Sequence, residues 1–243
     1  MCIPTKLANN LSAVEPSTDM KIFSTTTPAF REASERWLVA SLRAVERNAD
    51  LTIEHFGEIS GSPDFQSEAF REHNIEKNRR LAGWIRANAG ELIFVTDADI
   101  IYVRPFLRRL EEELGAADLA LADEGPFGGY NIGQMVIRCQ EPVAEFFEKV
   151  ADELSRGAWD QEAVNRLLQQ SGLVHRPLSP LFSNTSIWEG LPDIMRVEIF
   201  SFHATATQAE QGISSLERKQ RRMEEIGRYL TALESPAVPV QPL

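Results

Sequence analysis

Apolar residues recur along the chain with two different spacings, which predict an alternation of strands and helices. Short apolar runs are typical of buried strands, whereas apolar positions three or four residues apart are typical of helices with one buried face. The predicted strands cover residues 22–25, 51–55, 92–96, 119–122, 132–137 and 197–202. The predicted helices cover residues 30–47, 75–88, 106–114, 159–170 and 213–233, together with a helix that opens at Pro142.

The order of these segments predicts an α/β domain. Strands that alternate with helices favour a mostly parallel central sheet flanked by helices on both faces. We assign a single domain of this kind to residues 20–234. Residues 1–19, which are polar and patternless, are expected to form a flexible arm, and the Pro-rich residues 235–243 a flexible tail. In such a sheet, a ligand is expected beyond the carboxyl ends of the strands.

The charge balance narrows the classes of function. Lys and Arg number 25, Asp and Glu number 36, and the formal net charge is −11. This balance argues against nucleic-acid and membrane-surface binding, both of which favour a positive field. The sequence contains no apolar stretch of about 18 residues. Its N-terminus also lacks the basic segment followed by an apolar segment that is typical of a signal peptide. Neither a transmembrane segment nor a secretory signal is therefore expected.

The two cysteines, Cys2 and Cys139, lie far apart and match no metal-binding spacing, which excludes a disulfide framework. A reducing cytoplasm is therefore the expected compartment. An acidic protein that handles an anionic substrate would need a metal ion or a local basic cluster.

A candidate metal site follows the most apolar predicted strand. Residues 92–96 run directly into Asp97, Ala98 and Asp99. In an extended chain the residues at positions i and i+2 project to the same side, so the two carboxylates can converge. Two unpaired carboxylates would repel each other, and a divalent cation such as Mg²⁺ or Mn²⁺ removes that repulsion. The alternative is a pair of aspartates that only form a turn after the strand.

Two enzyme classes place an Asp-x-Asp motif after an apolar strand. In phosphatases like the haloacid dehalogenases, the motif is expected near the start of the domain, with Thr or Val two residues beyond it. Here the motif lies far along the chain and Ile101 holds that position, so the match is poor. The other class comprises the metal-dependent glycosyltransferases.

An ordered series of motifs resembles the nucleotide-diphospho-sugar transferases of GT-A fold and retaining type, over about residues 20–232. In chain order these motifs are Lys77-Asn78-Arg79-Arg80, Thr96-Asp97-Ala98-Asp99-Ile100, Arg104-Pro105, Asn131-Ile132-Gly133-Gln134, Trp159-Asp160-Gln161, Phe202-His203-Ala204-Thr205 and Lys219. The resemblance implies a GT-A fold, which is Rossmann-like, with a mostly parallel central sheet flanked by helices.

The resemblance also implies a set of metal ligands. Asp99 would bind Mn²⁺ or Mg²⁺, Asp97 would share the metal or contact the donor ribose, and His203 would be the third ligand. Taken alone, a histidine at the end of a strand is more often a structural residue. A cation held in this way would neutralise the charge that builds on a departing diphosphate.

Further residues would contact the donor sugar if the resemblance holds. The side chain of Asn131 would contact the sugar or the acceptor, and Gly133 would let the ligand approach closely, although both residue types are also common in turns. Asp160 and Gln161 would line the sugar, with Gln161 near the anomeric carbon. The alternative for Asp160 is a helix N-cap, because it precedes a helical pattern.

Basic and hydroxyl residues complete the implied donor site. Either Lys77 or Arg80 would contact the donor, and Lys219 would contact the diphosphate. All three also fit a solvated helix face. Thr25 and Thr26 end the first predicted strand, where the nucleoside is expected.

The function implied is therefore that of a hexosyl- or pentosyltransferase that uses Mn²⁺ or Mg²⁺. The expected donor is a UDP-sugar, and the acceptor is an unidentified glycan, lipid or protein. The expected stereochemical outcome is retention. Two alternatives stay open, namely a Mg²⁺-dependent phosphatase of the haloacid dehalogenase type and a non-catalytic module that binds sugar nucleotides.

Overall fold

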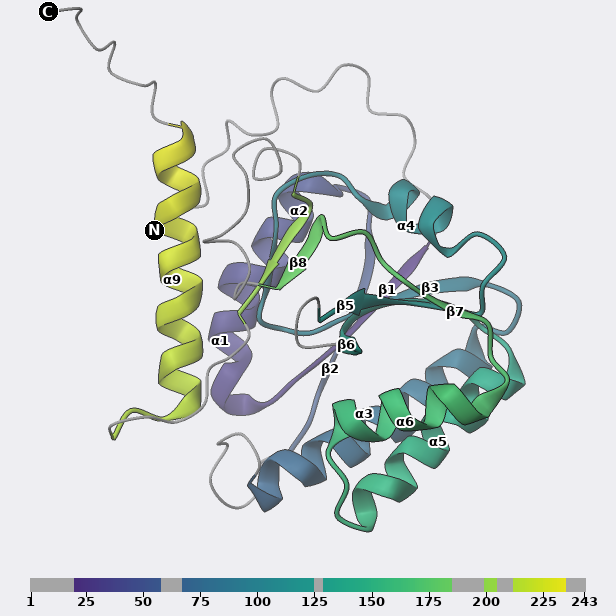
Figure 1. Ribbon diagram of the computed structural model, residues 1–243. Coiled ribbons are helices and arrows are strands. Elements are labelled where there is room, and N and C mark those ends of the chain that lie inside the picture. Colours follow the sequence, from purple (N-terminus) through teal and green to yellow (C-terminus); the bar gives the residue numbers. More distant parts are fainter. Residues whose placement is uncertain (1–19, 58–66, 125–128, 185–198, 205–211, 235–243) are drawn as a thin grey trace, which may run out of the picture.

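A computed structural model describes residues 20–57, 67–124, 129–184, 199–204 and 212–234 (Figure 1). The predicted arm (1–19) and tail (235–243) lie outside these ranges. Within the described ranges, no helix combines the length and the hydrophobicity that crossing a bilayer requires.

A six-stranded sheet forms the centre of the molecule. Its strand order is β2-β1-β3-β6-β5-β7, and all strands run in one direction except β6, which is antiparallel to both of its neighbours. The predicted mostly parallel sheet is therefore confirmed. In chain order the strands are β1 (Lys21–Thr26), β2 (Asp50–His55), β3 (Leu92–Thr96), β5 (Leu119–Asp123), β6 (Tyr130–Arg138) and β7 (His175–Pro177).

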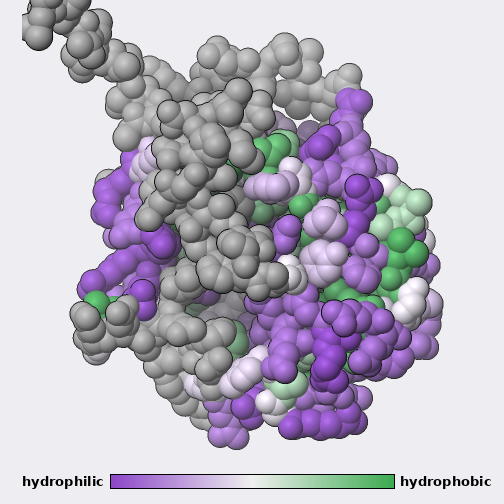
Figure 2. Space-filling model, in the orientation of Figure 1, coloured by the Kyte–Doolittle hydropathy of each residue, from purple (hydrophilic) through white to green (hydrophobic). Residues whose placement is uncertain are grey.

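Helices cover both faces of this sheet, as the sequence predicted. One face packs against α3 (Glu68–Ala87), α5 (Glu141–Ser155) and α6 (Asp160–Ser171), and the other against α2 (Ala40–Val45) and α4 (Leu107–Leu114) (Figure 1). Adjacent residues of a strand serve opposite cores. Val95 faces the first set of helices and Phe94 the second, and each is at most 1% exposed. Hydrophilic residues cover the outer surface of α5 and α6 (Figure 2).

Two predicted helices differ from the observed ones. The helix predicted over 75–88 begins earlier, at Glu68. Its added turns contain only two apolar residues, Ala69 and Phe70, which are adjacent and so show no helical spacing; the Ser67 hydroxyl accepts a hydrogen bond from the Phe70 amide there. The helix predicted over 30–47 consists of a 3₁₀ turn, α1, a π-helical segment and α2. Their bounds are Pro28–Phe30, Arg31–Ser34, Glu35–Val39 and Ala40–Val45.

A second, three-stranded sheet lies beside the first. Its order is β4-β9-β8, with β4 (Ile100–Tyr102), β8 (Phe182–Asn184) and β9 (Ser201–His203). Sequence periodicity did not find β4, β7 or β8, since three residues are too few to show a period. The strand predicted over 197–202 is β9; its first two residues lie outside the described ranges, and residues 199 and 200 precede the strand.

The last helix, α9 (Ser215–Glu234), packs against the small sheet and the π-helical segment. Trp37, Phe202, Met223 and Ile226 belong to one apolar cluster there. This third core joins the C-terminal helix to the sheet that continues from the Asp-x-Asp turn.

Candidate functional site

The register of the small sheet brings the Asp-x-Asp turn to a distant histidine. Asp97, Ala98 and Asp99 connect β3 to β4. In the antiparallel pairing of β4 with β9, Ile100 lies opposite His203, and the Ala204 amide donates to the Asp99 carbonyl at 3.0 Å. Two segments a hundred residues apart in the sequence therefore meet at one end of the sheet.

Three side chains converge at this point. The Nε2 atom of His203 lies 3.3 Å from Oδ1 of Asp99 and 3.7 Å from Oδ2 of Asp97. The candidate ligand atoms all lie within 4.8 Å of one another. The side chains of His203 and Asp99 are only 5% and 4% exposed, whereas that of Asp97 is 30% exposed. The group is therefore buried on one side and open on the other.

Each aspartate also binds one lysine, through its other oxygen. Lys77 of α3 binds Oδ1 of Asp97, and Lys219 of α9 lies 2.7 Å from Oδ2 of Asp99. The oxygens that face His203 are thus left free of lysine. Burial alone would raise the pKa of Asp99, but Lys219 and His203 outweigh it and hold that pKa well below its usual range. Burial alone would lower the pKa of Lys219, but Asp99 outweighs it and raises that pKa above its ordinary value.

This donor set fits a divalent cation. Adjacent ligands on an ion with bonds of about 2.1 Å lie about 3 Å apart. The separations of 3.3 and 3.7 Å between His203 and the two aspartates need only a small contraction to reach that value. Both carboxylate oxygens suit Mg²⁺ and Mn²⁺, and an imidazole nitrogen is a ligand that transition-metal ions accept; three protein ligands leave open positions for others. Asp97, Asp99 and His203 could therefore hold one such ion.

Gly133 makes room for the histidine. A Cβ atom at this position would lie 2.2 Å from Cε1 and 2.9 Å from Nδ1 of the His203 ring. The Gly133 carbonyl also accepts a hydrogen bond from the Asp97 amide at 2.8 Å. Sequence reasoning assigned this glycine to the close approach of a ligand, and the structure adds that the His203 ring occupies the space.

A buried polar network lies beneath the three side chains. The Tyr102 hydroxyl is 2.7 Å from Oγ1 of Thr96 and 3.4 Å from Oε1 of Gln134, which also accepts from the Ser201 hydroxyl at 2.8 Å. Each member lies within three residues of Asp97, Asp99, Gly133 or His203 along the chain. The network therefore ties together the strands that carry the site.

A second polar group adjoins the first and contains the predicted sugar-contacting residues. Oε1 of Glu124 accepts hydrogen bonds from Nδ2 of Asn131 at 2.5 Å and from Nε2 of Gln161 at 2.7 Å. Asp160 opens α6, and its Oδ1 accepts from the Gln161 amide at 2.8 Å. Burial raises the pKa of Asp160, and the charge of Asp97 acts in the same direction.

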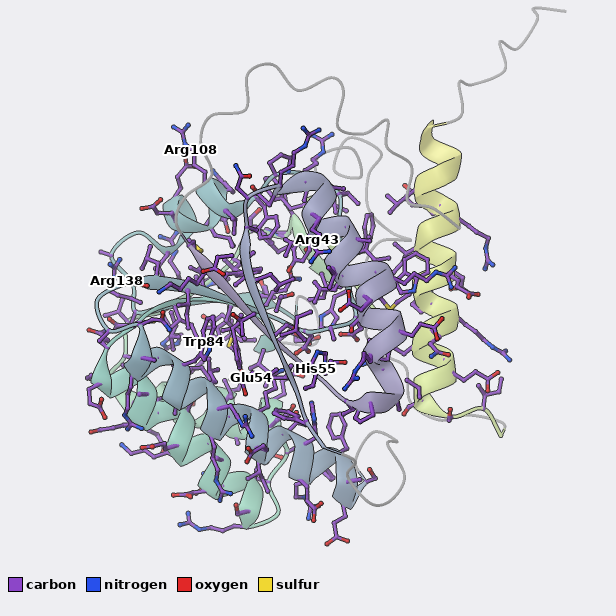
Figure 3. The ribbon with its side chains drawn as sticks, turned by 180° about the vertical axis from the view of Figure 1, so that it is seen from behind. Arg43, Glu54, His55, Trp84, Arg108 and Arg138 are labelled. Carbon is purple, nitrogen blue, oxygen red and sulfur yellow. The ribbon has the colours of Figure 1, made fainter. Side chains whose placement is uncertain are left out.

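The remaining predicted residues separate into two groups. Thr25 and Thr26 end β1 and are buried, at 7% and 2% exposure. Arg80 lies on the outer side of α3, where it pairs with Glu76 at 2.7 Å and with Glu54 of β2 at 2.8 Å (Glu54 is labelled in Figure 3). Of the two predicted candidates, Lys77 and Arg80, Lys77 is the one that reaches the Asp-x-Asp turn.

Sequence reasoning missed Glu124 and gave Gln134 no role. Glu124 directly follows β5, as Asp97 directly follows β3. A polar residue after a buried strand of a parallel sheet is the signal that identified Asp97, and it could have identified Glu124 as well. Gln134 lies inside an apolar strand, where only the tertiary structure reveals its partners.

A family model described as nucleotide-diphospho-sugar transferase matches residues 86–212. The match includes the Asp-x-Asp turn, Asn131, Gln161 and His203. No curated protein matches the sequence.

Solved structures of glycosyltransferases share the fold. One involved in the glycosylation of the major capsid of PBCV-1 is 14% identical with a TM-score of 0.59; 86% of this chain and 100% of that chain are covered. GlyE of Streptococcus pneumoniae TIGR4 is 15% identical with a TM-score of 0.55, and 89% of this chain covers 64% of GlyE. The galactosyltransferase LgtC, solved with donor and acceptor sugar analogs, is 11% identical with a TM-score of 0.51. The similarity covers 87% of this chain and 96% of the LgtC chain. These are GT-A folds, which confirms the predicted fold class.

Proposed function

Because the chain belongs to the nucleotide-diphospho-sugar transferase family, we propose that it transfers a sugar from a nucleotide-diphosphate donor with the help of a divalent cation. The observation that carries this proposal is the convergence of Asp97, Asp99 and His203. We further propose a UDP-sugar as donor, Mn²⁺ or Mg²⁺ as the ion, and retention at the anomeric carbon. The sugar is a hexose or a pentose, and the acceptor is a glycan, a lipid or a protein.

The basic residues at the site support an anionic donor. A cation held by the three ligands would neutralise negative charge that develops on the leaving diphosphate. Lys219 adjoins Asp99, so we assign it to the diphosphate. Lys77 adjoins Asp97, whereas Arg80 is held by Glu54 and Glu76, and we therefore assign the donor contact on α3 to Lys77.

The other end of the site is assigned to the sugar and the nucleoside. Asn131, Asp160 and Gln161 would bind and orient the sugar, and Gly133 leaves the space that the His203 ring occupies beside it. Thr25 and Thr26, at the carboxyl end of β1, would lie against the nucleoside. The buried, unpaired Cys139 fits a reducing compartment, and we propose the cytoplasm as the site of action.

Thermal unfolding with ligand tests this proposal. Mn²⁺ with UDP at about 100 times its Kd should stabilise the protein by about 2.7 kcal/mol, which corresponds to a rise in Tm of about 5–10 °C. The Asp99→Ala and Asp99→Asn variants should lose this rise, because one ligand of the ion is gone. The quantity compared is the shift with ligand, since Asp99→Ala also leaves Lys219 without its partner.

Asp152→Ala is the matched control, since Asp152 is an exposed residue of α5. It should keep the full shift. A wild-type protein that shows no shift with any nucleoside diphosphate, in the presence of Mn²⁺ or Mg²⁺, would contradict the proposal. Metal-dependent hydrolysis of nucleotide sugars would identify the donor, and binding without hydrolysis or transfer would indicate a non-catalytic module instead.

A further inference from the structure

Two backbone segments of the proposed sugar site are fixed to each other by one side chain. Asn165 of α6 accepts from the Tyr130 amide at 2.7 Å and donates to the Tyr130 carbonyl at 2.9 Å and to the Gln161 carbonyl at 2.8 Å. Gly129 has a φ of +83°, and a Cβ there would lie 2.7 Å from Oδ1 of Asn165. The start of β6 and the first turn of α6 therefore have a fixed separation.

A single carboxylate oxygen of Glu124 contacts side chains from both segments. Its Oε1 accepts from Nδ2 of Asn131 on β6 and from Nε2 of Gln161 on α6, at 2.5 and 2.7 Å. Glu124 itself is partly buried at the end of β5. Three elements thus place one carboxylate between two side-chain amides.

The chemistry of these groups determines which way each amide points. A carboxylate only accepts hydrogen bonds, so each amide must turn its NH₂ group toward Glu124. For Asn131 a second contact requires the same orientation, because its Oδ1 accepts from the Gly133 amide at 2.8 Å. For Gln161, the contact with Glu124 is the one side-chain hydrogen bond that the described part of the chain provides, and it directs the carbonyl oxygen away from the carboxylate.

We propose that Glu124 is a positioning residue, which orients the amides of Asn131 and Gln161 for the donor sugar. This inference rests on the proposed function. Its consequence is that the carbonyl oxygen of Gln161, an acceptor with partial negative charge, is held in one direction rather than exchanging with the NH₂ group. Positive charge that develops on the sugar in the transition state would favour the oxygen.

Two substitutions at Glu124 separate positioning from direct chemistry. Glu124→Met removes the acceptor while keeping a side chain of similar length. It should lower kcat for donor hydrolysis or transfer at least tenfold and leave the Kd for Mn²⁺ with UDP within twofold. Glu124→Gln keeps an acceptor oxygen and should retain more than a third of the wild-type kcat. Glu162→Met, at an exposed neighbouring position of α6, is the matched control and should leave both values unchanged.

The kinetic outcomes decide the role. If Glu124→Met leaves kcat unchanged, Glu124 does not position the amides. If Glu124→Gln abolishes turnover as completely as Glu124→Met, the carboxylate itself takes part in the reaction and the positioning role is wrong. In the Gln161→Ala background, the effect of Glu124→Met should shrink, since the two substitutions act through one contact.

A measurement without turnover keeps this inference separate from the proposed function. The side-chain amide signals of Asn131 and Gln161 can be assigned in ¹⁵N spectra by their loss in Asn131→Leu and Gln161→Met. In the wild type, the amide protons should exchange slowly with solvent. In Glu124→Met both signals should move, that of Gln161 to the position of a free amide and that of Asn131 by less, because its Oδ1 still accepts from the Gly133 amide. Unchanged signals would overturn the inference. If no donor is turned over at all, the proposed function fails while the amide signals still decide the role of Glu124.

Discussion

At the scale of single residues, the position of the His203 ring depends on the absence of a side chain at Gly133. The ring of His203 occupies the volume that a side chain at position 133 would need, with Cε1 only 2.2 Å from the place of a Cβ. The position of His203 is thereby limited by β6, and its backbone position by the pairing with β4. His203 and Gly133 therefore form one steric unit.

Gly133→Ala should displace the histidine. The added methyl group should cost about 1–3 kcal/mol of folding stability, as is usual for overpacking. The variant should also lose most of the Tm shift caused by Mn²⁺ with UDP. Gly83→Ala is the control, since nothing lies within 4 Å of a Cβ on that exposed helical position. It should be neutral or slightly stabilising. A Gly133→Ala protein with a full shift would show that His203 tolerates displacement.

His73 gives the protein a specific pH dependence. This ring lies one turn before Lys77 on α3 and packs edge-on against Phe56, with centroids 4.8 Å apart. Burial and the nearby Lys77 lower the pKa of His73 from 6.5 to about 4. As the pH falls below 6.5, the unfolded chain takes up a proton that the folded protein still excludes. His73 therefore reduces the free energy of unfolding progressively between about pH 6.5 and pH 4.

The contribution of His73 should lower the free energy of unfolding by about 2 kcal/mol between pH 7 and pH 5. Urea unfolding of the wild type and of His73→Phe at both values measures it. The wild type should lose about 2 kcal/mol more than the variant over this interval. Equal losses would mean that His73 is already protonated in the folded protein near neutral pH or is not buried.

At the scale of elements, the position of α9 determines the position of Lys219. The helix approaches the π-helical segment so closely that a Cβ on Gly227 would lie 2.8 Å from Cζ3 of Trp37. Lys219 lies about two turns before this contact on the same helix. Its Nζ also lies 6.0 Å from the centroid of the Phe30 ring. A change in the contact between Gly227 and Trp37 should therefore move the lysine away from Asp99.

Gly227→Ala should loosen this contact. The expected cost is about 1–3 kcal/mol of folding stability. The Kd for UDP with Mn²⁺ should rise severalfold, because Lys219 no longer has a fixed place. Amide hydrogen exchange should be faster in α9 than in the wild type and unchanged in α5, which packs on the far face of the central sheet. Unaltered exchange in α9 would show that Trp37 moves aside at little cost.

At the scale of the whole molecule, the acidic chain places two lysines at one site. The net charge is −11, yet Lys77 and Lys219 come from distant parts of the chain and meet at the Asp-x-Asp turn. Several arginines are instead held on the surface by glutamates, such as Arg86, which pairs with Glu141 at 2.7 Å and with Glu148 at 2.5 Å. The two lysines therefore form a local basic cluster in an acidic protein. The net charge of the chain predicted that an anionic substrate would need such a cluster or a metal ion.

The sequence by itself determined the fold class, most of the longer elements and the location of the Asp-x-Asp turn. These features have local causes, because apolar periodicity reflects the face that each segment buries. The resemblance of its ordered motifs to a known family also implied that His203, Asn131 and Gln161 belong near that turn. That order is a property of the chain and needs no coordinates.

Only the tertiary structure decided which side chains meet. The strands β4 and β8 are too short to show a period, and the pairing of Ile100 with His203 joins segments with no local relation. The choice of Lys77 over Arg80 depends on which face of α3 turns inward, and the contacts of Glu124 depend on three separate elements. Such contacts are set by packing between distant segments, and packing of this kind leaves no periodic trace along the chain.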